Sequence, residues 1–282
     1  MPFIDVVAPL VASKTLGKVA LLALGMGVYS LIPIWKEYTT YADANNMPSQ
    51  IHAALSLVLG CLLVFRTNTA YNRWWEARTL WGTLVNTSRN AAIKLNRIAC
   101  VSPDDRLKTR ELLVAFPVAL KHHLRSEAAP ALPESIRAMA RGATHVPQAL
   151  IAQVYELVGH AKKAGTIDGD ELRVLDTELT RFLDVCGGCE RIQKTRIVTS
   201  YRTFARQCIV LVLLTLPWGM AHDFGWWTLP LTIIISYFMI GLEIVAEHVE
   251  EPFGYDEDDL DLEAICTGIE TSVNEVFGVT TR

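Results

Sequence analysis

The sequence predicts an all-α membrane protein, with four transmembrane helices extended into a cytosolic helical bundle. Three observations lead to this fold class. First, 51% of the 282 residues are hydrophobic while 20% are charged, which is too apolar for an average soluble enzyme. Second, the apolar residues gather in four runs that approach the thickness of a bilayer. Third, the polar segments carry apolar residues at helical spacing, without the alternation typical of strands.

The four apolar runs form two pairs that flank a long polar region. They are Val19–Trp35, Ile51–Phe65, Cys208–Met220 and Phe224–Leu242. The first run, at about 17 residues, is marginal for a hydrocarbon core of ~30 Å. The second and third are short for lone lipid-facing helices, so we expect other helices to surround them, with the second lining a pore.

Basic residues predict the orientation of these helices. Lys and Arg cluster before the first run, after the second and before the third, whereas the two short connections between paired runs lack them. By the positive-inside rule, both termini then lie in the cytosol. We therefore expect a multi-pass protein of the inner membrane. The N-terminal residues 1–18 have no basic segment before their short apolar run, which is not typical of a cleaved signal peptide.

The second run continues into a polar segment as one predicted helix. No proline interrupts residues Ile51–Gly82, and only Gly60 weakens the helical propensity. Leu57, Cys61 and Phe65 recur every fourth residue and so share one slowly drifting face. Several copies around an axis would stack these side chains as apolar rings, which is a channel neck. Ordinary packing inside a helical bundle is the alternative interpretation.

The polar region is predicted to be helical with short breaks. The expected helices are Asp105–Glu127 with a kink at Pro117, Pro147–Lys163, Asp170–Ile192, and a last helix capped by Asp258 or Asp259 that ends at Phe277. Residues 128–147 have the composition of connectors. The chain then divides into 1–82 with the first two transmembrane helices, a cytosolic region at 83–206, the last two transmembrane helices at 207–246, and a C-terminal segment at 247–282.

Several classes of function are disfavoured by composition and motifs. The net charge of −4 argues against a nucleic-acid partner. The six cysteines are scattered, which is not typical of a disulfide framework. No dinucleotide-binding or phosphate-binding fingerprint is visible, and the histidines show no shared metal spacing. We therefore expect no enzyme and no resident cofactor.

Three sequence blocks carry a resemblance to a known family. They are FRTNTAYNRWWEARTLWG at Phe65–Gly82, GGCER at Gly187–Arg191 and EHVEEPFGYDEDDLDL at Glu247–Leu262. Together, in this order, they resemble the bestrophin family, in particular its prokaryotic branch. The resemblance implies a homopentameric ion channel around a central pore, with an apolar neck in the membrane and a second constriction at the cytosolic end. The expected partners are further copies of the chain, permeant monovalent ions and the lipid bilayer.

The resemblance also implies roles for particular residues. Leu57, Cys61 and Phe65 match the family's neck, although Cys61 replaces a bulky apolar residue and would widen the middle ring. Counting back from GGCER places the cytosolic aperture at Asp170, with Ile167 as the nearest apolar alternative. The family implies passage of chloride, whereas a ring of Asp170 carboxylates would favour Na⁺ or K⁺. An ordinary helix N-cap is the other interpretation of Asp170.

Charged residues after the fourth run suggest an ion-pair network and a calcium site. Glu243, Glu247 and Glu250 share a helical face, and we expect them to neutralise Arg66 or Arg73 and so connect the second and fourth helices. Further on, Asp256 and Asp259 match positions that hold calcium in animal bestrophins, although Tyr255 replaces an acid of that cluster. Solvated or helix-capping carboxylates are the alternative there.

The pair Cys186 and Cys189 offers a competing function. CGGC resembles a redox CxxC motif, so a membrane-bound thiol oxidoreductase is the second hypothesis. Neither a βαβ context nor a second cysteine pair supports redox or zinc chemistry, and packing is the simpler interpretation. A non-conducting membrane scaffold is the third hypothesis.

Overall fold

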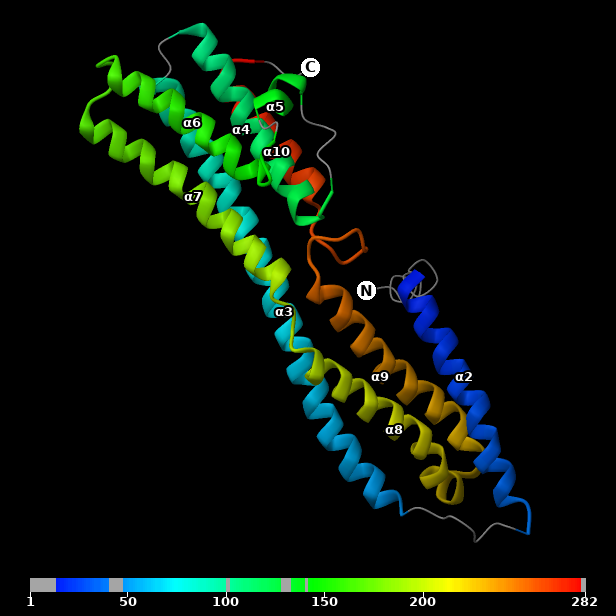
Figure 1. Cartoon of the computed structure of the whole chain (residues 1–282). Helices are drawn as coiled ribbons and strands as arrows, with labels where there is room; N and C mark the ends of the chain where they lie inside the picture. The colour runs from blue at the N-terminus through cyan, green and yellow to red at the C-terminus, as the bar shows by residue number, and fades with distance from the viewer. Residues whose placement is uncertain (1–13, 41–47, 100–101, 128–132, 140–141, 280–282) are drawn as a thin grey trace. The chain divides into compact units, whose positions relative to one another are not determined.

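Every regular element of the described residues is helical (Figure 1). The computed structural model describes residues 14–40, 48–99, 102–127, 133–139 and 142–279. Most of the N-terminal stretch considered as a signal peptide, residues 1–13, lies outside them. The chain divides into two compact units: unit 1 comprises residues 1–72 and 196–250, and unit 2 comprises residues 73–195 and 251–282.

Unit 1 is a bundle of apolar helices. It contains α2 (Lys14–Glu37), the first part of α3 (Ser49–Lys94), α8 (Thr199–Phe224) and α9 (Thr228–Glu250), with the 3₁₀ turn η2 (Gly225–Trp227) between the last two. Helices α2, α8 and α9 pack on one another, side by side in Figure 1. Buried leucines of α3, Leu59 and Leu63, pack against Ile209 and Leu213 of α8. Burial of this apolar surface holds the bundle together.

Three helical stretches are long and apolar enough to cross a membrane. They are 15–37, 50–99 and 199–250. The last stretch contains both α8 and α9, and so covers the third and fourth predicted runs. By length and composition, α2, α3 and the stretch that contains α8 and α9 are therefore candidates for crossing a membrane.

Helix α3 is longer than predicted. It has 46 residues, passes from unit 1 to unit 2 after Asn72, and is followed by the π-helical turn η1 (Leu95–Ala99). The extension beyond Gly82 is explained by burial, because Leu84, Ala91 and Ala92 belong to the core of unit 2. Tertiary packing of this kind stabilises a helix beyond its intrinsic propensity.

Unit 2 packs its helices around one hydrophobic core. Its elements are the second part of α3, α4 (Pro103–Leu124), α5 (Glu134–Met139), α6 (Val146–Lys163), α7 (Gly169–Lys194) and α10 (Leu262–Val276). Trp81 of α3 is fully buried in this core. Phe116 of α4 meets Phe182 of α7 edge to face, with ring centroids 5.0 Å apart. Aromatic pairs prefer this geometry, so the contact fixes α4 against α7.

The predicted helix with Pro117 inside it is present as α4. Sequence-based boundaries differ from the structure at two other places. Helix α5 occupies part of the predicted connector 128–147. The N-cap of α10 is Asp261, which accepts a hydrogen bond from the Ala264 N–H at 2.9 Å, and not Asp258 or Asp259. Residues 73–82 belong to unit 2 and residues 196–206 to unit 1, so the two units cut across the four predicted segments.

Close packing of α3 against α8 yields a first testable prediction. A Cβ atom on Gly219 would lie 2.5 Å from Nδ1 of the buried His52 ring. We expect Gly219→Ala to destabilise unit 1 by about 1–3 kcal/mol through overpacking. In contrast, a Cβ on Gly60 meets nothing within 4 Å, so Gly60→Ala is expected to stabilise the helix by up to about 1 kcal/mol.

Thermal melting of the purified protein measures the stability of both glycine variants. A His52→Ala background should reduce the loss caused by Gly219→Ala, because the clashing ring is gone. Equal effects of the two glycine changes would contradict this packing interpretation.

Candidate ion pathway and its charged supports

The predicted neck residues lie on an exposed face of α3. Leu57 is 71% exposed and Phe65 is 66% exposed, and Cys61 is exposed between them. The opposite side of the same helix is buried, with Leu59 and Leu63 in the core of unit 1. An apolar face that unit 1 leaves uncovered, within a membrane-crossing stretch, faces lipid, another chain or an ion pathway.

Directly after the neck, a buried arginine meets two carboxylates of α9. Arg66 is fully buried, with Nη2 2.7 Å from Oε2 of Glu250 and Nε 3.6 Å from Oε2 of Glu243. Glu250 also accepts a hydrogen bond from the Ile197 N–H at 3.1 Å, just before α8 begins. A buried charge of this kind requires a partner, so the cluster joins α3 to α9 and to the start of α8.

The other predicted partners are placed differently. Glu247 is bound by Arg206 of α8 at 2.7 Å, and both side chains are about two-fifths exposed. Arg206 also donates from Nε to Glu243 at 3.0 Å. Arg73 lies in unit 2, where it donates to the carbonyls of Ile192 and Thr195 at the end of α7. Two members of the predicted acidic face, Glu243 and Glu250, therefore neutralise Arg66 and connect α3 to α9. The third member, Glu247, pairs with Arg206.

The two aperture candidates have opposite environments. Ile167 is 3% exposed and belongs to the core of unit 2, so its side chain does not line an opening of the chain as folded. Asp170 is exposed at the start of α7, and its carboxylate pairs with Arg173 at 2.7 Å. The N-cap is Asp168, which accepts hydrogen bonds from the N–H groups of Asp170 and Glu171 and forms a capping box. The neighbouring guanidinium weakens the negative field that a ring of Asp170 would produce.

The PFG segment after α9 is anchored by the end of α4. The Arg125 guanidinium donates to the carbonyls of Phe253 and Gly254 at 2.9 and 2.8 Å, and lies 3.9 Å from the centre of the Tyr255 ring. Tyr255 in turn donates to Glu127 at 2.6 Å. These contacts explain why an aromatic residue stands where an acid was expected: it packs against Arg125.

The calcium candidates lie in the same loop. Asp259 accepts a hydrogen bond from the Asp256 N–H at 2.6 Å, which closes a turn inside the acidic run. Among the described residues, Asp256 and Asp259 are not part of a group of three ligating side chains. Calcium at these positions stays a prediction.

Both cysteines of CGGC are buried thiols. Burial raises the pKa of Cys186 to about 12, and it raises the pKa of Cys189 further. A thiol that stays protonated at neutral pH is a poor nucleophile and a poor redox group. The buried positions agree with packing, the simpler interpretation of these residues.

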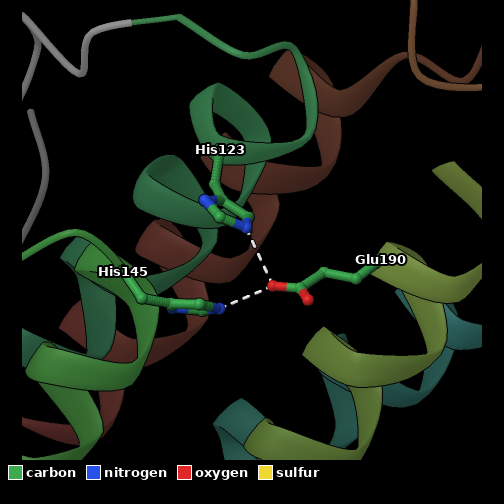
Figure 2. Close-up of side chains that lie close together, drawn as sticks. All are labelled: His123, His145 and Glu190. Atoms are coloured by element: carbon green, nitrogen blue, oxygen red, sulfur yellow. Dashed lines mark hydrogen bonds and ion pairs between the residues drawn. The ribbon is translucent and has the colours of Figure 1, made fainter. Parts of the chain in front are cut away.

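A cluster that sequence spacing missed lies at the ends of three helices. His123 in the last turn of α4 and His145 at the N-cap of α6 point to one carboxylate oxygen of Glu190 in α7 (Figure 2). Their Nε2 atoms are 2.8 and 2.5 Å from Oε1. Lys194 donates to Oε2 at 2.9 Å. Burial raises the pKa of Glu190, but these hydrogen bonds outweigh burial and lower the pKa to about 2.

The lowered pKa of Glu190 yields a second prediction. Because the folded pKa of about 2 lies below the ordinary value of 4.5, the unfolded chain binds more protons between these pH values. Stability from this carboxylate is thus present above pH 4.5 and is lost as the pH falls toward 2. We expect the melting temperature of Glu190→Gln to depend less on pH in this window than that of the wild type. Glu156→Gln, at an exposed carboxylate of α6, should keep the wild-type slope.

Fold and site together define a class of protein: an all-helical membrane protein with an apolar, uncovered face on its second membrane-crossing helix. The sequence model of the family described as Bacterial/Fungal Bestrophin protein matches residues 4–275. The chain belongs to this bestrophin family.

Individual relatives agree with the family. A voltage-dependent anion channel-forming protein of Synechocystis sp. is 34% identical over 284 aligned positions, which cover 96% of this chain and 88% of the relative. One of Nostoc sp. is 32% identical and covers 78% of this chain and 75% of the relative. A crystal structure of a mutated bacterial bestrophin homolog from Klebsiella pneumoniae has a TM-score of 0.87 at 26% identity, covering 94% of this chain and 99% of that chain. The resemblance predicted from three sequence blocks is confirmed, and these relatives are named as channels, not enzymes.

Proposed function

We propose that the chain is the subunit of a passive anion channel, a homopentamer with α3 of each copy facing a central pore. The observation that carries this proposal is the exposed face of Leu57, Cys61 and Phe65, which stands opposite the buried side of a membrane-crossing helix. Copies arranged around an axis cover this face and stack it into three apolar rings. Apolar rings of this kind gate conduction by dewetting.

Two arguments support chloride over cations. The edge of the Phe65 ring carries partial positive charge, which stabilises an anion beside it. The relatives are named anion channel-forming proteins, and nothing among them supports a preference for Na⁺ or K⁺. At the cytosolic end, the carboxylate of Asp170 is paired with Arg173, so its charge is a weak basis for cation selectivity.

The proposed topology follows from hydropathy and charge. Helices α2, α3, α8 and α9 each cross the inner membrane once, and unit 2 with both termini lies in the cytosol. Labelling of single cysteines with a membrane-impermeant reagent tests this orientation. The connection between α2 and α3 should react from outside, and Lys162→Cys in unit 2 only after permeabilisation; the reverse pattern would overturn the topology.

Planar-bilayer recording of the purified protein tests the proposed function. In asymmetric NaCl, we expect the reversal potential to move toward the chloride equilibrium potential. A shift toward the sodium potential would overturn anion selectivity, and silence at every voltage would favour a scaffold. Mass photometry gives the subunit number independently of conduction.

The thiol hypothesis makes a separate prediction. A Cys186→Ala/Cys189→Ala variant should keep its chloride flux, because both thiols are buried and their pKa values are raised. Flux into protein-loaded vesicles measures this. Loss of flux from a variant that still assembles would show that the thiols take part in channel function.

A further inference from the structure

Three potential metal ligands converge at the cluster in unit 2. Nε2 of His123, Nε2 of His145 and a carboxylate oxygen of Glu190 all lie within 4.8 Å of one another, and all three side chains are partly buried. Among the described residues this is the one such group. Figure 2 shows both imidazoles and the carboxylate directed toward a common point from different helices.

We propose that His123, His145 and Glu190 form a binding site for Zn²⁺ or a similar borderline divalent metal ion, with a water molecule as fourth ligand. Two imidazole nitrogens and one carboxylate oxygen are a donor set that zinc accepts in a tetrahedral arrangement. Calcium and magnesium prefer oxygen ligands alone, so the two histidines select against them.

The distances between the three ligand atoms require only a small side-chain movement to accommodate the ion. Tetrahedral ligands at about 2.0–2.1 Å from zinc are roughly 3.3 Å apart. The two N···O separations of 2.8 and 2.5 Å therefore have to open by less than about 1 Å. Side-chain rotation within three partly exposed residues supplies this movement without displacing a helix.

The surroundings orient the carboxylate. Lys194 holds Oε2 of Glu190 at 2.9 Å, which leaves Oε1 directed toward the histidines. An outer partner of this kind orients a metal-binding carboxylate. His123 lies in the last turn of α4, where the helix dipole favours a positive charge.

Metal binding changes which ring nitrogen of His145 carries the proton. Nδ1 of His145 accepts the Gln148 N–H at 3.1 Å and so caps α6, which puts the proton of a neutral ring on Nε2. When Nε2 binds the metal, this proton moves to Nδ1 and the capping hydrogen bond is lost. The Gln148 N–H is exposed, so water takes the place of the ring. Zinc should therefore speed hydrogen exchange at this amide.

A nearby thiol is excluded from the site. Sγ of Cys186 lies 3.8 Å from Oε1 of Glu190, but it is buried and outside the group of three. X-ray absorption of the zinc-loaded protein should show nitrogen and oxygen neighbours at about 2.0–2.2 Å and no sulfur at about 2.3 Å.

Zinc binding to the full-length protein in detergent tests the proposal. After metals are removed with EDTA and Zn²⁺ is added back, we expect the wild type to retain one Zn²⁺ per chain through gel filtration, measured by elemental analysis, and to have a raised melting temperature. Ca²⁺ and Mg²⁺ should cause no such rise. His123→Ala and His145→Ala should each weaken zinc affinity roughly tenfold or more in titration calorimetry. His160→Ala is the matched control, because it removes an exposed histidine of α6 outside the cluster.

Several outcomes would overturn the site. Wild type without retained zinc would show that the three side chains form only a hydrogen-bonded cluster. Equal zinc affinity of wild type and both histidine variants, or sulfur among the neighbours, would place the metal elsewhere. Circular dichroism of each variant verifies that its helices are intact, and Glu190→Gln gives a second, nearly isosteric loss of a ligand.

Discussion

Replacing Phe65 by alanine is expected to raise the single-channel conductance several-fold and to lower the preference for chloride. The ring is the largest of the three side chains on the exposed face of α3, so its loss widens and wets the innermost apolar ring. Its positive edge is lost at the same time, which removes a contact that favours anions. Leu57→Ala should raise conductance as well, while Cys61→Phe should lower it.

Matched controls separate the pore from general packing. Phe238→Ala in α9 and Leu211→Ala in α8 remove the same groups from exposed positions of other membrane helices. We expect both controls to conduct like the wild type in planar bilayers. If the neck variants and the controls change conductance alike, or if conductance does not follow side-chain bulk at residues 57, 61 and 65, the proposed pore is wrong.

Arg66→Met is expected to be the most destabilising single substitution of a charged residue in unit 1. Removal of the guanidinium leaves Glu250 buried opposite an apolar side chain, at a cost of about 3–5 kcal/mol. The melting temperature should fall by roughly 10 °C or more, and the yield of assembled protein should fall with it. Fluorescence-detected gel filtration after heating measures both quantities.

A double-variant cycle isolates the buried pair. Arg66→Met/Glu250→Gln should lose less stability than the two single variants added together, since it leaves no unpaired charge at this position. Glu247→Gln is the control: the same chemical change in the same helix, but at an exposed pair with Arg206 that is worth about 0–1 kcal/mol. Equal losses from Glu247→Gln and Glu250→Gln would contradict the assignment of Arg66 to Glu250.

The sequence by itself determined where the helices lie and what kind of protein they form. Apolar runs, helical spacing and the missing prolines of α3 are local properties, so they predicted the membrane helices and placed Leu57, Cys61 and Phe65 on one face. The block at Phe65–Gly82 resembles the bestrophin family in its sequence alone. These features depend on short stretches of chain, which is why they are visible without the fold.

Only the tertiary structure decided which side chains meet. Helical spacing places Glu243, Glu247 and Glu250 on one face of α9. Packing nevertheless buries Glu250 against Arg66, whereas Glu247 pairs with Arg206 at a more exposed position. The same holds for Ile167, which the core of unit 2 covers.

The cluster of His123, His145 and Glu190 joins residues up to 67 positions apart on three helices. No regular spacing marks it, because its geometry depends on how α4, α6 and α7 end against one another. Partner choice across helices is a property of packing, and the pattern of a single helix does not contain it.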